Sequence, residues 1–162
     1  GDQLVSMDVL PVELADRVEG SAAGEDDDGD SEELGPSEGP WVLVASATGL
    51  GKRVPVDQFR LQKRAGMGLR CMKFRRDGDV LVGLKVLGAG EELLLVSEKG
   101  VIVRMQADAV PQQSRAATGV RLQRLDAGDR LSEVVLVPPA AEEDVADPVA
   151  DEVALVDAAA DA

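Results

Sequence analysis

The chain has 162 residues, of which 44% are hydrophobic and only 2% aromatic, and its formal net charge is −14. It contains no histidine, which removes the commonest general base and metal ligand, and the single Cys71 excludes an internal disulfide or a cysteine zinc cluster. No apolar stretch reaches the roughly 20 residues that span a bilayer, and no signal peptide is visible. These features fit a soluble cytosolic protein. Because the chain starts with Gly1, we interpret it as a piece of a longer protein.

The two signs of charge occupy different parts of the chain. Residues 41–137 contain 16 of the 17 Lys and Arg but 10 of the 31 acids, a balance of +6. Residues 1–40 contain 13 acids and one base, and residues 138–162 contain 8 acids and no base. A basic folded region between acidic segments favours an electrostatic partner, most plausibly nucleic acid, with the acidic segments as solubilising stretches or as competitors for the basic surface.

The first two segments differ in character. Residues 1–11 open on a Gly-Asp pair followed by apolar residues. The same pattern leads into the last strand of each of two repeated units, at 41–88 and 89–137, so we predict that residues 1–11 are the end of a preceding unit of this kind, a preceding blade. Residues 12–40 are acidic, small and nearly free of large apolar groups, and such a stretch cannot offset the entropy lost on folding. We predict a disordered acidic insertion at 12–40 and a disordered acidic tail at 138–162.

Residues 41–88 and 89–137 form two similar units. In each unit an apolar run, a tight turn, a basic strand and an arginine-bearing loop follow in the same order, and a Gly-Asp pair leads into the last strand. Asp79 and Asp129 of these pairs lie 50 residues apart. Four short strands in a unit of about fifty residues are typical of a propeller blade. The alternative, two unrelated meanders of similar composition, does not explain the shared order. The fold class predicted is therefore all-β, with two four-stranded blades and the end of a third.

Several motifs of the two units resemble one family. The first unit contains ATGLGKRVPV at 47–56 and RAGMG at 64–68, and the second contains QSRAATGVRL at 113–122 and LDAGD at 125–129. With these motifs the sequence closely resembles the C-terminal domain of the DNA gyrase A chain, which belongs to the type IIA topoisomerases. The resemblance implies a propeller-like β-pinwheel whose basic outer rim wraps duplex DNA without sequence specificity, so that the parent enzyme supercoils it negatively.

The resemblance also implies partners and a location. Expected partners are duplex DNA, the remainder of the gyrase A chain and the gyrase B chain in an A2B2 assembly, in the cytoplasm with the nucleoid. The catalytic tyrosine, a P-loop and the glycine-rich basic box of the first blade are absent from this sequence. This stretch is therefore expected to need no cofactor and to have no catalytic activity of its own, while other domains of the parent enzyme use ATP and Mg.

Contacts to DNA are expected to be made with phosphates. Few aromatic residues argue against stacking on single strands, and no basic recognition helix argues against base readout in the major groove. Arginines and lysines along the blade edges would hold a bent duplex by charge neutralisation. The candidate contacts are Lys52, Arg53, Arg60, Lys63, Arg64, Arg70, Lys73, Arg104, Arg115, Arg121 and Arg124.

Other residues and functions rank lower. Arg75 and Arg76 stand beside Asp77 and are expected to be partly neutralised, and the Gly-Asp pairs with Gly119 are interpreted as turn and close-packing devices. Two alternative functions stay open at this point: the C-terminal domain of the topoisomerase IV A chain, and a propeller-like protein-interaction module.

Overall fold

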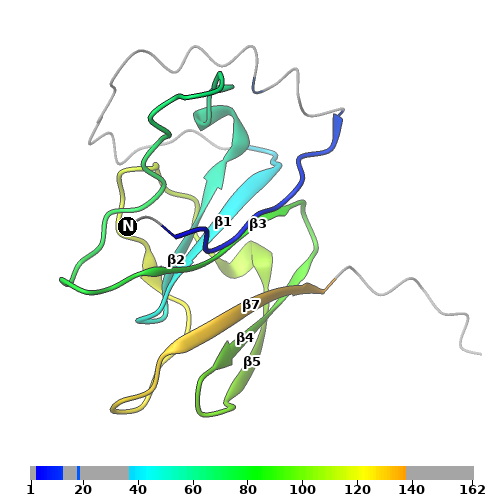
Figure 1. The fold of residues 1–162 in the computed structure, drawn as a ribbon. Coiled ribbons are helices and arrows are strands. Elements are labelled where there is room, and N and C mark those ends of the chain that lie inside the picture. Colours follow the sequence, from blue (N-terminus) through cyan, green and yellow to red (C-terminus); the bar gives the residue numbers. More distant parts are fainter. Residues whose placement is uncertain (1–2, 13–17, 19–36, 138–162) are drawn as a thin grey trace, which may run out of the picture.

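Two antiparallel sheets make up the part of the chain that the computed structural model describes, residues 3–12, 18 and 37–137 (Figure 1). The strands of the first sheet lie in the order β3-β1-β2-β6, formed by Leu81–Leu87, Trp41–Ser46, Leu50–Pro55 and Val120–Arg121. Those of the second lie in the order β5-β4-β7, formed by Ile102–Gln106, Glu92–Ser97 and Leu131–Val137. Short 3-10 turns follow β2 at Val56–Gln58 and β5 at Ala107–Ala109. The predicted all-β class is confirmed. The predicted disorder of 12–40 and 138–162 falls mostly outside the described residues, but Val18, within 12–40, is described and is buried in one cluster with Val42 and Val44.

The core between the sheets follows from the strand period of two. In β1, Trp41, Leu43 and Ala45 point to one face and pack on Leu93 and Leu95 of β4. The opposite face of β1 is also covered, so all six of its residues are buried and the strand is an uninterrupted apolar run. A propeller arrangement requires this, because the middle strand of a blade has a neighbouring layer on each side.

The outer face of β1 is covered by irregular chain. Val42 and Val44 pack with Val56, Met72 and the half-buried Leu10. The segment that holds Leu10 runs along β3, where Ser6 and Asp8 bond through their side chains to the backbone of the strand (Figure 1). Residues 3–12 form no strand of their own, and their assignment to the end of a preceding blade stays a prediction.

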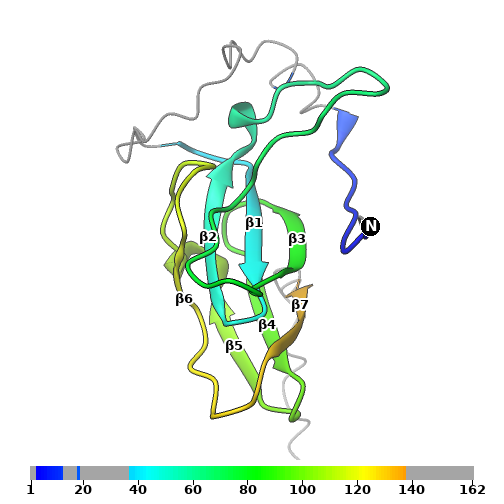
Figure 2. The same cartoon turned by 60° about the vertical axis from the view of Figure 1, so that its left-hand side comes forward.

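The first sheet has the predicted four strands, but the fourth is contributed by the second unit. In the sequence, β6 lies between β5 and β7 of the second sheet, but it pairs with β2 of the first sheet (Figure 2). Leu50 pairs with Arg121, and Gly51 pairs with Val120. The chain before it makes a second, separate contact with β2, a parallel bridge between Arg53 and Gln112 in which the Gln113 N–H donates to the Arg53 carbonyl at 2.9 Å. The two units therefore exchange chain and do not stand as separate modules.

A glycine permits the exchange. Gly119 has φ +89°, and a Cβ built on it would lie 2.7 Å from the Gly51 carbonyl oxygen. A side chain there would be strained by the backbone conformation and would also separate β6 from β2. The interpretation of Gly119 as a close-packing device agrees with this geometry.

We expect Gly119→Ala to lower the free energy of unfolding by about 3 kcal/mol, because a left-handed alanine costs about 1 to 2 kcal/mol and overpacking adds a similar amount. The matched control is Gly128→Ala, since Gly128 has φ +71° but open space around it, and about 1 kcal/mol is expected. Urea unfolding of both variants checks this. Equal losses in the two variants would show that the β2–β6 contact is not tight.

Candidate nucleic-acid interface

Lys52 is buried and its charge is used inside the fold. Its side chain is 0% exposed, and Nζ donates to the carbonyl oxygens of Ser114 at 2.6 Å, Arg115 at 2.7 Å and Ala117 at 2.7 Å. The expectation that Lys52 contacts a DNA phosphate is therefore corrected: the ammonium fastens a loop of the second unit to β2. The sequence contains one indication that position 52 is buried: the residue at the equivalent position one unit later is the apolar Val103.

The expectation that Arg53 contacts a DNA phosphate is also corrected. Its guanidinium donates to the Val110 carbonyl at 2.7 Å and forms an ion pair with Asp108 at 2.8 Å, while its centre lies 4.5 Å from the Trp41 ring centroid. With 9% exposure it presents little charge to solvent. Arg53 and Lys52 are neighbours on β2, and both hold chain of the second unit.

Two further candidates have partners at the surface. Arg104, the counterpart of Arg53 on β5, is exposed and pairs with Glu92 on β4, so its charge is balanced. Arg115 is half-buried, and its guanidinium donates to the Arg70 carbonyl at 3.4 Å. The structure places both on the outside of the sheets but leaves less free positive charge at these positions than the sequence suggested.

The remaining candidates gather on two exposed stretches. The connection from the 3-10 turn after β2 to β3 contains no acid between Asp57 and Asp77, and its bases are exposed except the half-buried Arg60. The candidates on it are Arg60, Lys63, Arg64, Arg70 and Lys73. Arg121 on β6 and Arg124 beyond it are also exposed, and they lie 51 residues after Arg70 and Lys73. The basic surface therefore repeats with the fold.

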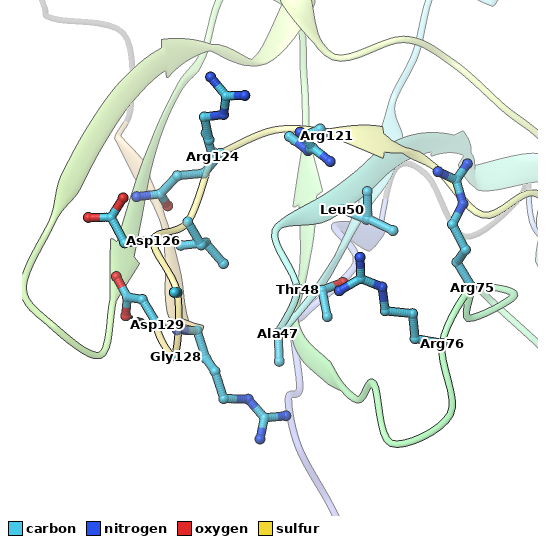
Figure 3. Close-up of a pocket in the computed structure, with 14 residues that line it drawn as sticks. Ala47, Thr48, Leu50, Arg75, Arg76, Arg121, Arg124, Asp126, Gly128 and Asp129 are labelled. Atoms are coloured by element: carbon cyan, nitrogen blue, oxygen red, sulfur yellow. Dashed lines mark hydrogen bonds between the residues drawn. The ribbon is translucent and has the colours of Figure 1, made fainter.

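Sequence reasoning ranked Arg75 and Arg76 low and missed Arg130. Arg75, Arg76 and Arg130 line a pocket of about 390 Å³ together with Arg121 and Arg124. Figure 3 shows Arg75, Arg76 and Arg121 around Thr48 of the β1–β2 turn and Leu50 at the start of β2, with Arg124, Asp126 and Asp129 across the pocket. The pocket brings together side chains that are more than forty residues apart, which no local pattern could indicate.

The Gly-Asp pairs hold the turns beside this pocket. Asp79 accepts from the Thr48 hydroxyl at 2.6 Å and from the Thr48 backbone N–H at 3.2 Å. Asp129 accepts from the backbone N–H of Lys99 at 3.1 Å, and so fixes the equivalent turn between β4 and β5. The interpretation of these pairs as turn devices agrees with both sets of bonds.

The single cysteine of the chain, Cys71, is half-buried and free. Burial raises the pKa of the half-buried Cys71 thiol, which keeps it protonated and unreactive at neutral pH. No group of three or more His, Cys, Asp or Glu suited to a metal ion occurs in the described part of the chain. Nor does any helix in that part have the length and apolar character needed to cross a membrane.

Comparison with known proteins gives one family. The family model "DNA gyrase C-terminal domain, beta-propeller" matches residues 40–87 and 91–138, so the chain belongs to this family. The A chain of DNA gyrase from Synechocystis sp. is 44% identical over 156 residues, which is 91% of this chain and 18% of that protein. The chain thus spans less than a fifth of the length of this relative.

Solved structures agree on the fold. A DNA gyrase A C-terminal domain superposes with a TM-score of 0.56 at 29% identity, over 62% of this chain and 34% of that chain. The C-terminal domain of a DNA topoisomerase IV gives the same TM-score at 21% identity, over 67% of this chain and 32% of that chain. The second likeness concerns the fold alone.

Stability is expected to rise with pH through Lys52. Burial lowers the pKa of this ammonium from 10.5 to about 8. Between these values the folded chain has released a proton that the unfolded chain still binds, so the free energy of unfolding increases with pH in that window. Urea unfolding below and above pH 8 should show this rise in the unmodified chain and in Lys99→Met, which removes an exposed lysine, but not in Lys52→Met. An identical pH dependence in all three proteins would contradict the assignment.

Proposed function

We propose that the chain is the DNA-wrapping part of a gyrase A chain, because it belongs to the family of DNA gyrase C-terminal beta-propeller domains. In this role it binds the phosphates of duplex DNA. The relative at 44% identity is a gyrase A chain, whereas the likeness to a topoisomerase IV domain stands at 21% identity. This difference favours gyrase over the topoisomerase IV alternative. No contact among the described residues favours the protein-interaction alternative.

The exposed basic connection between β2 and β3 is the observation that carries the proposal. From Asp57 to Asp77 it has seven bases and no acid, and the units repeat part of this pattern, with Arg64, Arg70 and Lys73 matched by Arg115, Arg121 and Arg124 at a spacing of 51 residues. Charges recurring along successive blades suit a curved duplex, because they meet phosphates at intervals and read no base. Lys52 and Arg53 are left out of the contact set.

The wider assignment follows from the same family. We propose that the chain works within a gyrase A chain paired with gyrase B chains as A2B2, and that the parent enzyme uses ATP and Mg through domains outside this stretch. The chain itself would supply binding and bending of DNA and no catalytic group. Its expected cellular location is the cytoplasm, with the chromosomal DNA of the nucleoid.

A salt series tests the binding. The affinity of the 162-residue chain for a duplex should fall linearly in a plot of log K against log salt, with a slope of about −0.9 for each phosphate neutralised, and should be the same for duplexes of different sequence. The triple variant Lys63→Gln, Arg64→Gln and Lys73→Gln should reduce the slope by about 3. The control is Arg104→Gln, whose charge Glu92 already balances, and its slope should change by less than about 0.5.

Two results would overturn the proposal. One is a duplex affinity that does not change with salt. The other is the absence of binding both in the full chain and in a chain without residues 138–162, whose eight acids compete for the basic surface.

A further inference from the structure

The pocket lined by Arg75, Arg76, Arg121, Arg124 and Arg130, hereafter the arginine pocket, contains more positive charge than the fold uses. Among the described residues, none of these five guanidinium groups forms an ion pair or a hydrogen bond. Two acids, Asp126 and Asp129, share the lining, and the backbone N–H groups of Lys99 and Arg130 already occupy Asp129. The pocket is therefore left with an excess of three positive charges (Figure 3).

Its walls are built from both units. The Gly49 carbonyl accepts the Leu122 N–H at 2.8 Å and the Gln123 N–H at 3.3 Å, and the Ala47 carbonyl accepts the Leu131 N–H at 2.9 Å. A Cβ on Gly49 would lie 2.6 Å from the Gln123 carbonyl oxygen, so the turn and the facing chain are in close contact. These bonds tie the β1–β2 turn to the chain between β6 and β7, and the pocket is a fixed feature of the junction.

A buried polar side chain adds an independent sign of a ligand. Gln123 lines the arginine pocket and is only 3% exposed, yet neither its Nε2 nor its Oε1 has a hydrogen-bond partner. An unpartnered buried amide costs free energy of about 1 to 3 kcal/mol. Both amide atoms are enclosed in this conformation, so a bound acceptor would reach the N–H once the Gln123 side chain turned toward the pocket, where an acceptor with negative charge would also meet the arginines.

We propose that the arginine pocket receives one phosphate of the DNA backbone, with the Gln123 amide as the buried donor and the arginines as its counter-charges. This inference rests on the proposed function and adds a defined anchoring point to a surface otherwise made of exposed charges. Phosphate fits the chemistry, because it is a small anion whose oxygens accept from guanidinium and amide N–H groups.

The repeat shows which parts of the pocket recur. Arg121 and Arg124 have basic counterparts in Arg70 and Lys73, 51 residues earlier, but the counterpart of Gln123 is the apolar Met72. The basic residues therefore recur with the unit, while the buried amide is particular to this junction.

Variants at two glutamines test the site. Gln123→Met removes the amide without changing the net charge, and its duplex affinity should fall about tenfold, the size of one hydrogen bond to a charged group. Gln113→Met is the matched control, because Gln113 Oε1 is also buried without a partner but does not line the pocket. Its affinity should change by less than about twofold. Thermal unfolding should show neither variant to be less stable than the unmodified chain, because no internal partner of either amide is lost and a buried polar group without a partner is removed.

A direct readout separates the sources of the phosphate. The side-chain amide signal of Gln123, identified in NMR spectra by its loss in Gln123→Met, is followed during addition of duplex or of inorganic phosphate. A shift with duplex, whether or not inorganic phosphate also shifts the signal, supports the inference. A shift with inorganic phosphate alone while duplex binds elsewhere overturns it in favour of a free-anion site.

The remaining outcomes also decide. If duplex binds but leaves the Gln123 signal unchanged, or if Gln113→Met weakens binding as much as Gln123→Met, the inference is wrong and the proposed function stands. If neither the unmodified chain nor the chain without residues 138–162 binds duplex, both are wrong.

Discussion

The edge of β2 is completed by chain from the second unit, and the other features of the molecule depend on this pairing. Two stretches of that chain bond to β2, a parallel bridge at Gln112 and the antiparallel strand β6, so that the first sheet gains its fourth strand from outside its own unit. An open strand edge is thereby covered, which a short strand of mixed sequence needs in order to persist in water. The arginine pocket exists because the same pairing brings the chain beyond β6 against the β1–β2 turn.

The pairing explains how the positive charge is divided. Lys52 and Arg53 lie on the strand that receives the exchanged chain, and carbonyl oxygens of that chain surround both cations. Buried carbonyls need donors, and a lysine or arginine can supply several at one point. The bases on the β2–β3 connection are exposed, except for the half-buried Arg60. The balance of +6 over residues 41–137 therefore includes two cations, Lys52 and Arg53, that are not offered to DNA.

Much of the fold was predictable from local pattern. The apolar run of β1, the turn at Gly49 and the Gly-Asp pairs recur with the unit, and each has the role that its residue types predict. The exchange of β6 was not predictable, because a strand of two residues gives no periodic signal and its partner lies seventy residues away. The candidate interface was predicted in outline, but a basic strand residue looks the same in a sequence whether carbonyls or water surround it. Arg75 and Arg76 were underrated for a related reason, since the acid beside them in the sequence is not their partner in space.

The basic residues thus fall into an internal set and a DNA-facing set, and lysine acetylation read by mass spectrometry tests this division most directly. In the folded chain without DNA, Lys63 and Lys73 should react quickly and Lys52 hardly at all, since its Nζ is enclosed by three carbonyls. Saturating duplex should protect Lys63 and Lys73 and leave Lys52 as it was. If Lys52 reacted as fast as the other two, or if duplex left Lys63 and Lys73 fully reactive, the division would be contradicted.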